Sequence, residues 1–271
     1  PHTKTSAPAL HRAKIELTYL GVAGWIITDG TTTILIDPYA SRQAVPPDGK
    51  APHVDEAAVA KLAPPHADLI LVGHSHFDHM LDVPAFAKRT GAQVMGSETT
   101  IAYARASGLA EDHLIQIKGG EDYEFERFSI RVIPSLHSAV GAKHPFSTPA
   151  GFGEGGTFAY LIRMSGHEIL VFDTASFVER ELEGLRPDVA IVATGARHEI
   201  HDYACRLMRA TGAPARVLAT HFDAWTKPLD EDRAPDDDTK QDLRDFEQEI
   251  HACAPSTRVE TPAHLQPITI E

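Results

Sequence analysis

Four residues of metal-binding type occupy six positions of the segment LILVGHSHFDHM, namely His74, His76, Asp78 and His79. Imidazole nitrogens and carboxylate oxygens bind divalent metal ions. His74 and His76 can point the same way from an extended chain, whereas Asp78 and His79 reach a neighbouring position only if the chain turns sharply. A lone histidine is usually a polar loop residue, but four ligands at this spacing favour a metal site. The spacing therefore predicts a turn that serves two metal ions.

The elements on either side of this segment explain how it is positioned. The apolar run DLILVG (68–73) predicts a buried strand, and DVPAFAKRT (82–90) predicts a helix with a proline in its first turn. Strand ends in α/β folds present catalytic side chains at the edge of a sheet. We therefore expect the four residues at such an edge.

The rest of the chain alternates between strand and helix patterns. Further helices are expected at 55–63, 98–108, 202–212 and 239–253. Further strands are expected at 15–21, 24–29, 32–37, 93–97, 114–118, 123–134, 157–164, 167–173, 188–194 and 216–220. Both halves combine antiparallel strands with β/α units, which predicts an α/β fold, a four-layer αββα sandwich. We expect a polar N-terminal arm at 1–14 and a single αββα domain at 15–271.

Composition narrows the function. A net charge of −13 argues against general nucleic-acid binding, because that requires a basic surface. No apolar run is long enough to cross a bilayer, so no membrane association is expected. The arm at 1–14, with its prolines, favours export over a cytoplasmic location. Cys205 and Cys253 are expected to be small buried apolar residues, with a disulfide between them as the alternative.

Two loops interrupt the alternation of strands and helices. Residues 138–156 are glycine-rich and long, which is typical of a functional loop. Residues 226–238 are acidic and are expected to form a solvated surface loop.

The segment HSHFDH resembles the H-x-H-x-D-H motif of the metallo-β-lactamase superfamily. Three later residues, each at the end of an expected strand, match the order of that superfamily's remaining ligands: His137, Asp173 and His221. Asp37 in ILIDPY is similar to the family's early aspartate, which supports the metal histidines by hydrogen bonding. The resemblance covers nearly the whole chain.

The resemblance implies a binuclear metal hydrolase with the αββα fold. One metal ion would take His74, His76 and His137, and the second would take Asp78, His79 and His221. Asp173 would bridge both metal ions. Asp78 and Asp173 would be the catalytic residues. Two such ions can hold a hydroxide and polarise the substrate. Zinc suits these nitrogen-rich ligands best, and manganese or iron would also accept them.

The resemblance also separates branches of the superfamily. β-Lactamases of the superfamily usually carry Cys or Ser where this chain has Asp173, and acyl-homoserine lactonases carry a Tyr where this chain has Ser176. The opening LTYLGVAGWIITDGTTTILIDPY, the loop VATGARHEIHDYAC and THFD resemble the branch that contains L-ascorbate-6-phosphate lactonase. Gly195-Ala196 departs from the Gly pair usual in that branch.

Several other residues are candidates for contact with a small-molecule substrate. His198 and His201 lie in the loop after an expected strand, where a substrate role and a helix-entry or surface role are both open. Asp223 is a candidate general acid or a cap for local backbone groups. His144 lies in the glycine-rich loop. Two aromatic residues could line the site but are more typical of a core: Trp25 and Tyr39.

The sequence is compatible with three functions. Hydrolysis of a carboxylic ester or lactone by metal-bound hydroxide is the leading hypothesis. A phosphodiesterase would need a cationic clamp, for which the candidates are Lys143, Arg197 and Lys227. A non-catalytic metal-binding protein that retains the fold is the third possibility.

Overall fold

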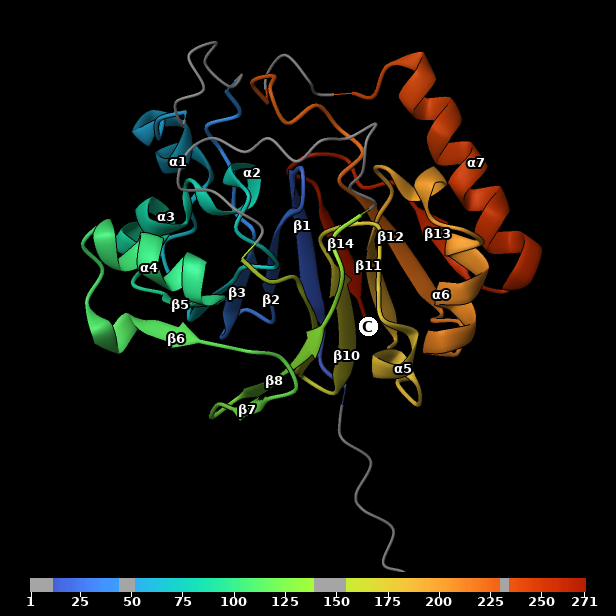
Figure 1. The fold of residues 1–271 in the computed structure, drawn as a ribbon, viewed down its shortest axis with the longest axis horizontal. Helices are drawn as coiled ribbons and strands as arrows, with labels where there is room; N and C mark the ends of the chain where they lie inside the picture. Colours follow the sequence, from blue (N-terminus) through green and yellow to red (C-terminus); the bar gives the residue numbers. More distant parts are fainter. Residues whose placement is uncertain (1–11, 44–51, 139–154, 230–233) are drawn as a thin grey trace, which may run out of the picture.

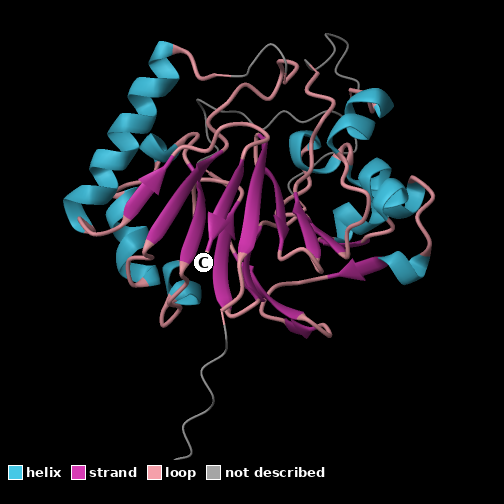
Figure 2. Ribbon diagram, turned by 180° about the vertical axis from the view of Figure 1, so that it is seen from behind, coloured by secondary structure: helices cyan, strands magenta, loops and turns pink. Residues whose placement is uncertain are grey.

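The structure, a computed structural model, describes residues 12–43, 52–138, 155–229 and 234–271. Two seven-stranded sheets pack face to face, and helices cover the outer face of each (Figure 1). Seen from behind, the strands again lie between two groups of helices (Figure 2). The expected αββα arrangement is confirmed.

The first sheet combines the N-terminal meander, the first β/α units and one distant strand. In spatial order its strands are β14 (Pro267–Ile270), β1 (Ile15–Gly21), β2 (Gly24–Thr28), β3 (Thr33–Ile36), β4 (Leu69–Leu71), β5 (Gln93–Gly96) and β6 (Leu114–Gln116). On its outer face lie α1 (Glu56–Leu62), α2 (Phe77–Met80), α3 (Val83–Thr90) and α4 (Glu98–Ala106), with the 3₁₀ helix η1 (Glu111–His113) before β6.

The second sheet is built from the second half of the chain. In spatial order its strands are β13 (Arg258–Glu260), β12 (Arg216–Thr220), β11 (Val189–Ala193), β10 (His167–Phe172), β9 (Phe158–Met164), β8 (Phe128–Pro134) and β7 (Asp122–Glu124). Its outer face is covered by α5 (Glu179–Leu182), α6 (Tyr203–Thr211) and α7 (Asp237–Cys253), and the 3₁₀ helix η2 (Arg197–Glu199) follows β11.

The main core lies between the two sheets. Alternate residues of the strands point into it, among them Leu17, Trp25, Ile36 and Ile162, each 1% exposed or less. Burying such side chains contributes roughly 1.5–3 kcal/mol each. Because β4 and β11 are covered on both faces, they are apolar throughout, which explains why their runs were recognisable in the sequence.

Capping residues set where the helices begin and end. The Asp55 carboxylate accepts hydrogen bonds from two backbone N–H groups at the start of α1, and Asp236 does the same for one N–H of α7. α3 starts with a proline in its first turn and ends at Gly91, whose φ of 78° is the left-handed conformation that glycine favours.

Strand direction gathers the polar strand ends at one edge. β3, β4 and β5 are parallel in the first sheet, as are β10, β11 and β12 in the second. β8 runs the same way as β10, because both are antiparallel to β9. The residues that follow β3, β4, β8, β10 and β12 therefore emerge on the same side.

Some expected elements differ from the structure. The expected strand 123–134 is a hairpin of β7 and β8, because the chain reverses where Phe125 N–H donates to the Phe128 carbonyl. β13, β14, α2 and α5 were not expected from the pattern, since each has at most four residues. In the described residues, no helix combines the length and hydrophobicity needed to span a membrane.

The cysteine prediction was wrong in its preferred form. Cys205 of α6 and Cys253 of α7 form a disulfide, and neither is fully buried. α6 and α7 pack side by side, which brings together two cysteines 48 residues apart in sequence. Spacing alone could not show this pairing.

Candidate metal centre

The turn expected in the H-x-H-x-D-H segment is present. β4 ends at Leu71, and His76 is the N-cap of the short helix α2. The backbone N–H of His79 donates to the His76 carbonyl, so the last two ligand-type residues lie on a helical turn. The first two precede it in extended chain, and the segment thus presents its side chains in two directions.

Seven ligand-type residues from four strand ends come together in three overlapping groups. In each group the potential ligand atoms lie within 4.8 Å of one another. The groups are His74, His76 and His137; His74, His79 and Asp173; and Asp78, His79 and His221. The structure therefore brings together all seven residues that the resemblance implied, in two outer groups joined by Asp173.

Asp173 lies between the two outer groups. Its Oδ2 is 2.5 Å from Nδ1 of His74 and 3.6 Å from Nδ1 of His79. A Cβ atom at Gly73 would stand 2.1 Å from the same oxygen, which no real contact allows. Only glycine at position 73 lets β4 approach this carboxylate so closely.

Asp37 supports the centre as expected. Its Oδ2 is 3.0 Å from Nδ1 of His79, and its Oδ1 accepts a 2.8 Å hydrogen bond from the backbone N–H of Gly73. Burial, followed by the nearby Asp173 carboxylate, raises the pKa of Asp37 well above its ordinary value. A partner on Nδ1 fixes the ring of His79 with Nε2 directed elsewhere.

Most of the pKa shifts in these groups match the forms that bind metal ions, whereas two run the opposite way. Burial raises the pKa of Asp173; burial opposes the charged form of His221, but the hydrogen bond to Asp78 raises its pKa. Burial, with the neighbouring histidines, lowers the pKa of His76 to about 2 and that of His74 well below its ordinary value. Burial opposes ionisation of Asp78, but His79 and His221 outweigh it and hold the pKa of this carboxyl far below its usual range. Neutral imidazoles and ionised carboxylates are the forms that bind metal ions.

One buried atom tests directly whether the residues fit a metal. Nε2 of His74 is buried without a hydrogen-bond partner in the described parts of the chain, while Nδ1 of the same ring faces Asp173. Buried polar groups are almost always paired, so an orphan nitrogen aimed into a cluster of ligands needs an explanation. A divalent cation would supply the missing partner, and the surrounding imidazole and carboxylate donors fit such an ion.

The backbone is strained at two of these strand ends. Asp37 has φ 37° and His221 has φ 56°, values in the left-handed region that non-glycine residues rarely adopt. The N–H of His221 donates a 2.6 Å hydrogen bond to the Val22 carbonyl, which holds this turn against the first sheet. Such strain is typical of functional sites.

Asp223 is the hub of a buried network next to His221. Its Oδ1 accepts hydrogen bonds from Tyr19 Oη (2.7 Å) and from the backbone N–H of Val22 (2.8 Å). Its Oδ2 pairs with Nη2 of Arg42 at 2.7 Å and with Nε2 of His264 at 2.9 Å. Burial opposes ionisation, but His264 and Arg42 hold the pKa of Asp223 well below its usual value. An ionised, fully engaged carboxylate suits the capping alternative and not a general acid.

The other loop candidates lie apart from the metal cluster or outside the described residues. His198 is exposed, and its Nε2 is 2.8 Å from Asp242 of α7. His201 is also exposed, just before α6. Arg197 is buried against α7, where it pairs with Asp242 and Glu249. Two candidates fall outside the described residues: His144 and Lys143.

The aromatic candidates are core residues. Nε1 of Trp25 donates to Oγ1 of Thr220 at 3.0 Å, and the ring is fully buried. Tyr39 is also fully buried and meets the edge of Phe77, the residue between His76 and Asp78. Both are therefore part of the buried core that supports the site.

Three features of the site were not expected from the sequence. Arg42 and His264 reach Asp223 from distant segments, and their positions carry no pattern that would single them out. Thr174 receives a 2.9 Å hydrogen bond on its hydroxyl from the N–H of Ser138, and so joins the turns that carry Asp173 and His137. The position of Thr174 next to Asp173 was the available signal.

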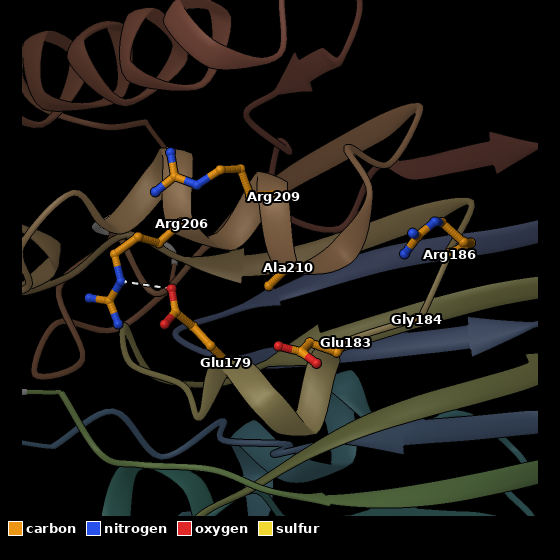
Figure 3. A pocket seen from close by; sticks show the side chains of 7 residues that line it. All are labelled: Glu179, Glu183, Gly184, Arg186, Arg206, Arg209 and Ala210. Atoms are coloured by element: carbon orange, nitrogen blue, oxygen red, sulfur yellow. Dashed lines mark hydrogen bonds and ion pairs between the residues drawn. The ribbon is translucent and has the colours of Figure 1, made fainter.

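A separate hollow lies over α5 and α6 (Figure 3). It has a volume of about 360 Å³, and none of the seven ligand-type residues lines it. Arg206 pairs with Glu179 at 2.9 Å, and Arg186 lies on the other side of the lining, beside Gly184. Its lining is Glu179, Glu183, Gly184, Arg186, Arg206, Arg209 and Ala210.

Comparisons with known proteins agree with this geometry. A family model described as a beta-lactamase superfamily domain matches residues 16–210. A UPF0173 metal-dependent hydrolase of Anaeromyxobacter sp. (strain K) is 29% identical over 232 residues, covering 80% of this chain and 78% of the relative. Another, from Heliobacterium modesticaldum, is 26% identical over 265 residues, covering 92% of this chain and 99% of the relative.

Solved structures show the same fold. A metallo hydrolase from the archaeon Ignicoccus hospitalis superposes with a TM-score of 0.66 at 18% identity, over 96% of this chain and 99% of its own. An isothiocyanate hydrolase from Delia radicum gut bacteria superposes with a TM-score of 0.62 at 16% identity, over 93% and 98% of the two chains.

Proposed function

Because this chain belongs to the metallo-β-lactamase superfamily and is a metal-dependent hydrolase, we propose that it cleaves a carboxylic ester or lactone at a binuclear centre. The observation that carries the proposal is the joining of two three-residue ligand groups through Asp173. A single-metal centre would need only one of these groups.

The proposed ligands divide between the two ions. His74, His76 and His137 would hold the first, and Asp78, His79 and His221 the second, with Asp173 between them. We propose zinc for both, with manganese or iron as alternatives. Two divalent ions so held supply Lewis acidity and a low-pKa water at neutral pH, which is the chemistry that hydrolysis requires.

The chain's own residues prepare this centre. Asp37 fixes the ring of His79, and the Gly73 N–H fixes Asp37 in turn. Thr174 joins the turns of Asp173 and His137, and Asp223 anchors the turn of His221 to the first sheet. Preorganised ligands hold the site in its reactive geometry without rearrangement during the reaction.

Two observations favour an ester or lactone over the alternatives. Asp173 stands where the superfamily's β-lactamases usually carry Cys or Ser, and the resemblance to the ascorbate-6-phosphate lactonase branch points to carbonyl substrates. Arg197, a candidate for the phosphate clamp, is instead occupied by Asp242 and Glu249 of α7. This removes one of the three candidates for the cationic clamp that a phosphodiesterase would need.

The test combines metal quantification with a substrate panel. Purified protein would be analysed for zinc, manganese and iron, then assayed with lactones, esters, thioesters, phosphodiesters and β-lactams. We expect about two ions per chain and turnover of esters or lactones, both strongly reduced in Asp78→Ala. Asp112→Ala, an exposed carboxylate on η1, is the matched control and should behave as wild type.

Two results would overturn the proposal. Turnover of phosphodiesters alone would assign the other hydrolytic chemistry. Stoichiometric metal without turnover of any panel member would support a non-catalytic metal-binding protein.

A further inference from the structure

Two of the large exposed hydrophobic side chains lie on turns that carry residues of the metal centre. In the described part of the chain three are exposed: Leu136 at 51%, Leu265 at 43% and Trp225 at 38%. Leu136 directly precedes His137, and Trp225 lies four residues after His221. Exposed apolar groups next to a reactive centre are typical of a binding surface for an apolar ligand.

Trp225 is attached to the centre by a chain of aromatic contacts. Its ring meets Phe77 edge-on, with centroids 5.4 Å apart, and Phe77 meets Tyr39 with centroids 6.2 Å apart. Phe77 and Tyr39 are buried, so they fix the position of the exposed indole. Since Phe77 stands between His76 and Asp78, the indole is held next to residues of both ligand groups.

Leu136 lies on the turn of His137, a member of the first ligand group. His137, its neighbour, packs against His74 and His76, with ring centroids 4.8 Å and 4.7 Å away. Trp225, in contrast, follows the turn of His221, which packs against His79. Exposed apolar residues therefore stand on the turns after β8 and β12, each near a member of a different ligand group.

We propose that Trp225 and Leu136 are specificity-determining residues that bind an apolar acyl chain of the ester substrate. This inference rests on the proposed function and narrows its substrate to esters with medium-length alkyl chains. When a hydrocarbon chain packs against these side chains, its own surface and the exposed indole and leucine surfaces are removed from water. The free energy gained is proportional to the apolar area removed.

The first test measures kcat/KM for p-nitrophenyl acetate, butyrate, hexanoate and octanoate with zinc-loaded protein. We expect wild-type kcat/KM to rise about two- to fourfold for each added methylene up to the length of the surface. Trp225→Ala and Leu136→Ala should lower the octanoate-to-acetate ratio at least tenfold. Leu265→Ala, which removes an exposed leucine that belongs to neither ligand turn, is the matched control and should keep the wild-type ratio.

A second test needs no turnover. Octanoate, titrated into metal-free protein, should change the tryptophan fluorescence, whereas acetate at the same concentration should not. The change should be absent in Trp225→Ala, because Trp25, the other tryptophan, is buried in the core.

The outcomes separate the two proposals. Absence of ester hydrolysis with an octanoate-dependent fluorescence change would reject the proposed function and keep the apolar surface. Hydrolysis with a flat chain-length profile, equal in all variants and without a fluorescence change, would overturn the specificity proposal alone. A flat profile with a change of oligomeric state in Trp225→Ala would also overturn it, and would assign the surface to contact between copies.

Discussion

Gly73 shows how one missing side chain shapes the metal centre. The strand end and the Asp173 carboxylate share a space in which a methyl group would lie 2.1 Å from a carboxylate oxygen. The same residue donates its N–H to Asp37. Gly73 therefore positions two aspartates at once, one by its absent Cβ and one by its backbone.

Gly73→Ala should weaken metal binding about 10- to 100-fold, the range typical of disturbing groups that orient metal ligands. The reason is displacement of Asp173 from its place between the two ligand groups. Competition with a chromogenic chelator would measure the affinity. Gly108→Ala is the control: its φ is +88° but nothing lies within 4 Å of its Cβ position, so it should lose stability and keep metal affinity. Unchanged metal binding in Gly73→Ala would contradict the assignment of Asp173.

At the residue scale, the motif predicted the grouping of the ligands well, because their spacing and order follow the strand ends. Asp37 was predicted to support the histidines, and its 3.0 Å contact with His79 confirms the hydrogen bonding. The partners of Asp223 were not predictable. Arg42 and His264 are 222 residues apart in sequence (264 minus 42). Only the assembled fold brings both to the Asp223 carboxylate.

Among the elements, α7 is attached to the second sheet by a buried arginine. The guanidinium of Arg197 pairs with Asp242 and Glu249 and stacks over Phe246, with 5.5 Å to the ring centroid. The arginine side chain is 1% exposed, whereas both carboxylates are more than a third exposed. Hydrogen bonding and packing therefore stabilise this contact more than charge alone does.

Arg197→Ala should lower the free energy of unfolding by roughly 2 kcal/mol, because hydrogen bonds to charged groups and ring packing are lost together. The kcat/KM of the metal-loaded enzyme toward an ester should stay within twofold of wild type. Urea unfolding and steady-state kinetics would measure the two effects. Arg206→Ala, which removes a surface pair with Glu179, should cost less than about 1 kcal/mol. Loss of hydrolysis without loss of stability would instead place Arg197 at the substrate.

Asp82 joins the loop after β3 to the start of α3. Its carboxylate accepts hydrogen bonds from the N–H groups of Ala40 and Ser41 and from the Ser41 hydroxyl. Burial raises the pKa of Asp82 to about 6 from an ordinary value of 3.8. The folded protein thus holds this proton more tightly than the unfolded chain does.

The sign of the pH effect follows from this shift. The stability that the raised pKa of Asp82 gives to the folded state is fully present below pH 3.8. This stability is lost as the pH rises through about 6. The stability of metal-free protein should therefore fall by up to roughly 3 kcal/mol over this window, relative to Asp82→Asn. Urea titrations at several pH values would measure both slopes. Parallel slopes in the two proteins would show that Asp82 does not titrate in this window.

At the scale of the whole molecule, one disulfide joins the last two large helices. Cys205 and Cys253 close a long loop that contains β12 and most of α7. Disulfides persist mainly in oxidising compartments, so the bridge is expected to depend on the redox conditions around the protein.

The double variant Cys205→Ser/Cys253→Ser should have a free energy of unfolding about 2–4 kcal/mol lower than wild type. The reason is that its unfolded chain regains the conformational freedom that the bridge removes. Thermal and urea unfolding would measure the loss, and wild type treated with reductant should match the variant. Metal content should be equal in both, since neither cysteine belongs to the ligand groups. Equal stability of variant and wild type would mean that the bridge adds no constraint.

Much of the molecular architecture was predictable, because buried strands and amphipathic helices leave clear periodic patterns. β13 and β14 were not, since a segment with prolines at 262 and 267 and only short apolar stretches carries little pattern of its own. β14 gains its structure from its partner: Ile15 pairs with Ile270, and Leu17 with Ile268. Long-range pairing of this kind cannot be read from local sequence.

The pairing of β1 with β14 also sets an order of assembly during synthesis. β1 emerges early from the ribosome and can pair with β2 at once, but it meets β14 only after residue 267 has been made. His264, just before that strand, reaches Asp223 only at the same stage, and Asp223 anchors the turn of His221. Contacts so distant in sequence form late in folding. We therefore expect the turn of His221, and with it the proposed second metal site, to remain incomplete until β14 pairs with β1.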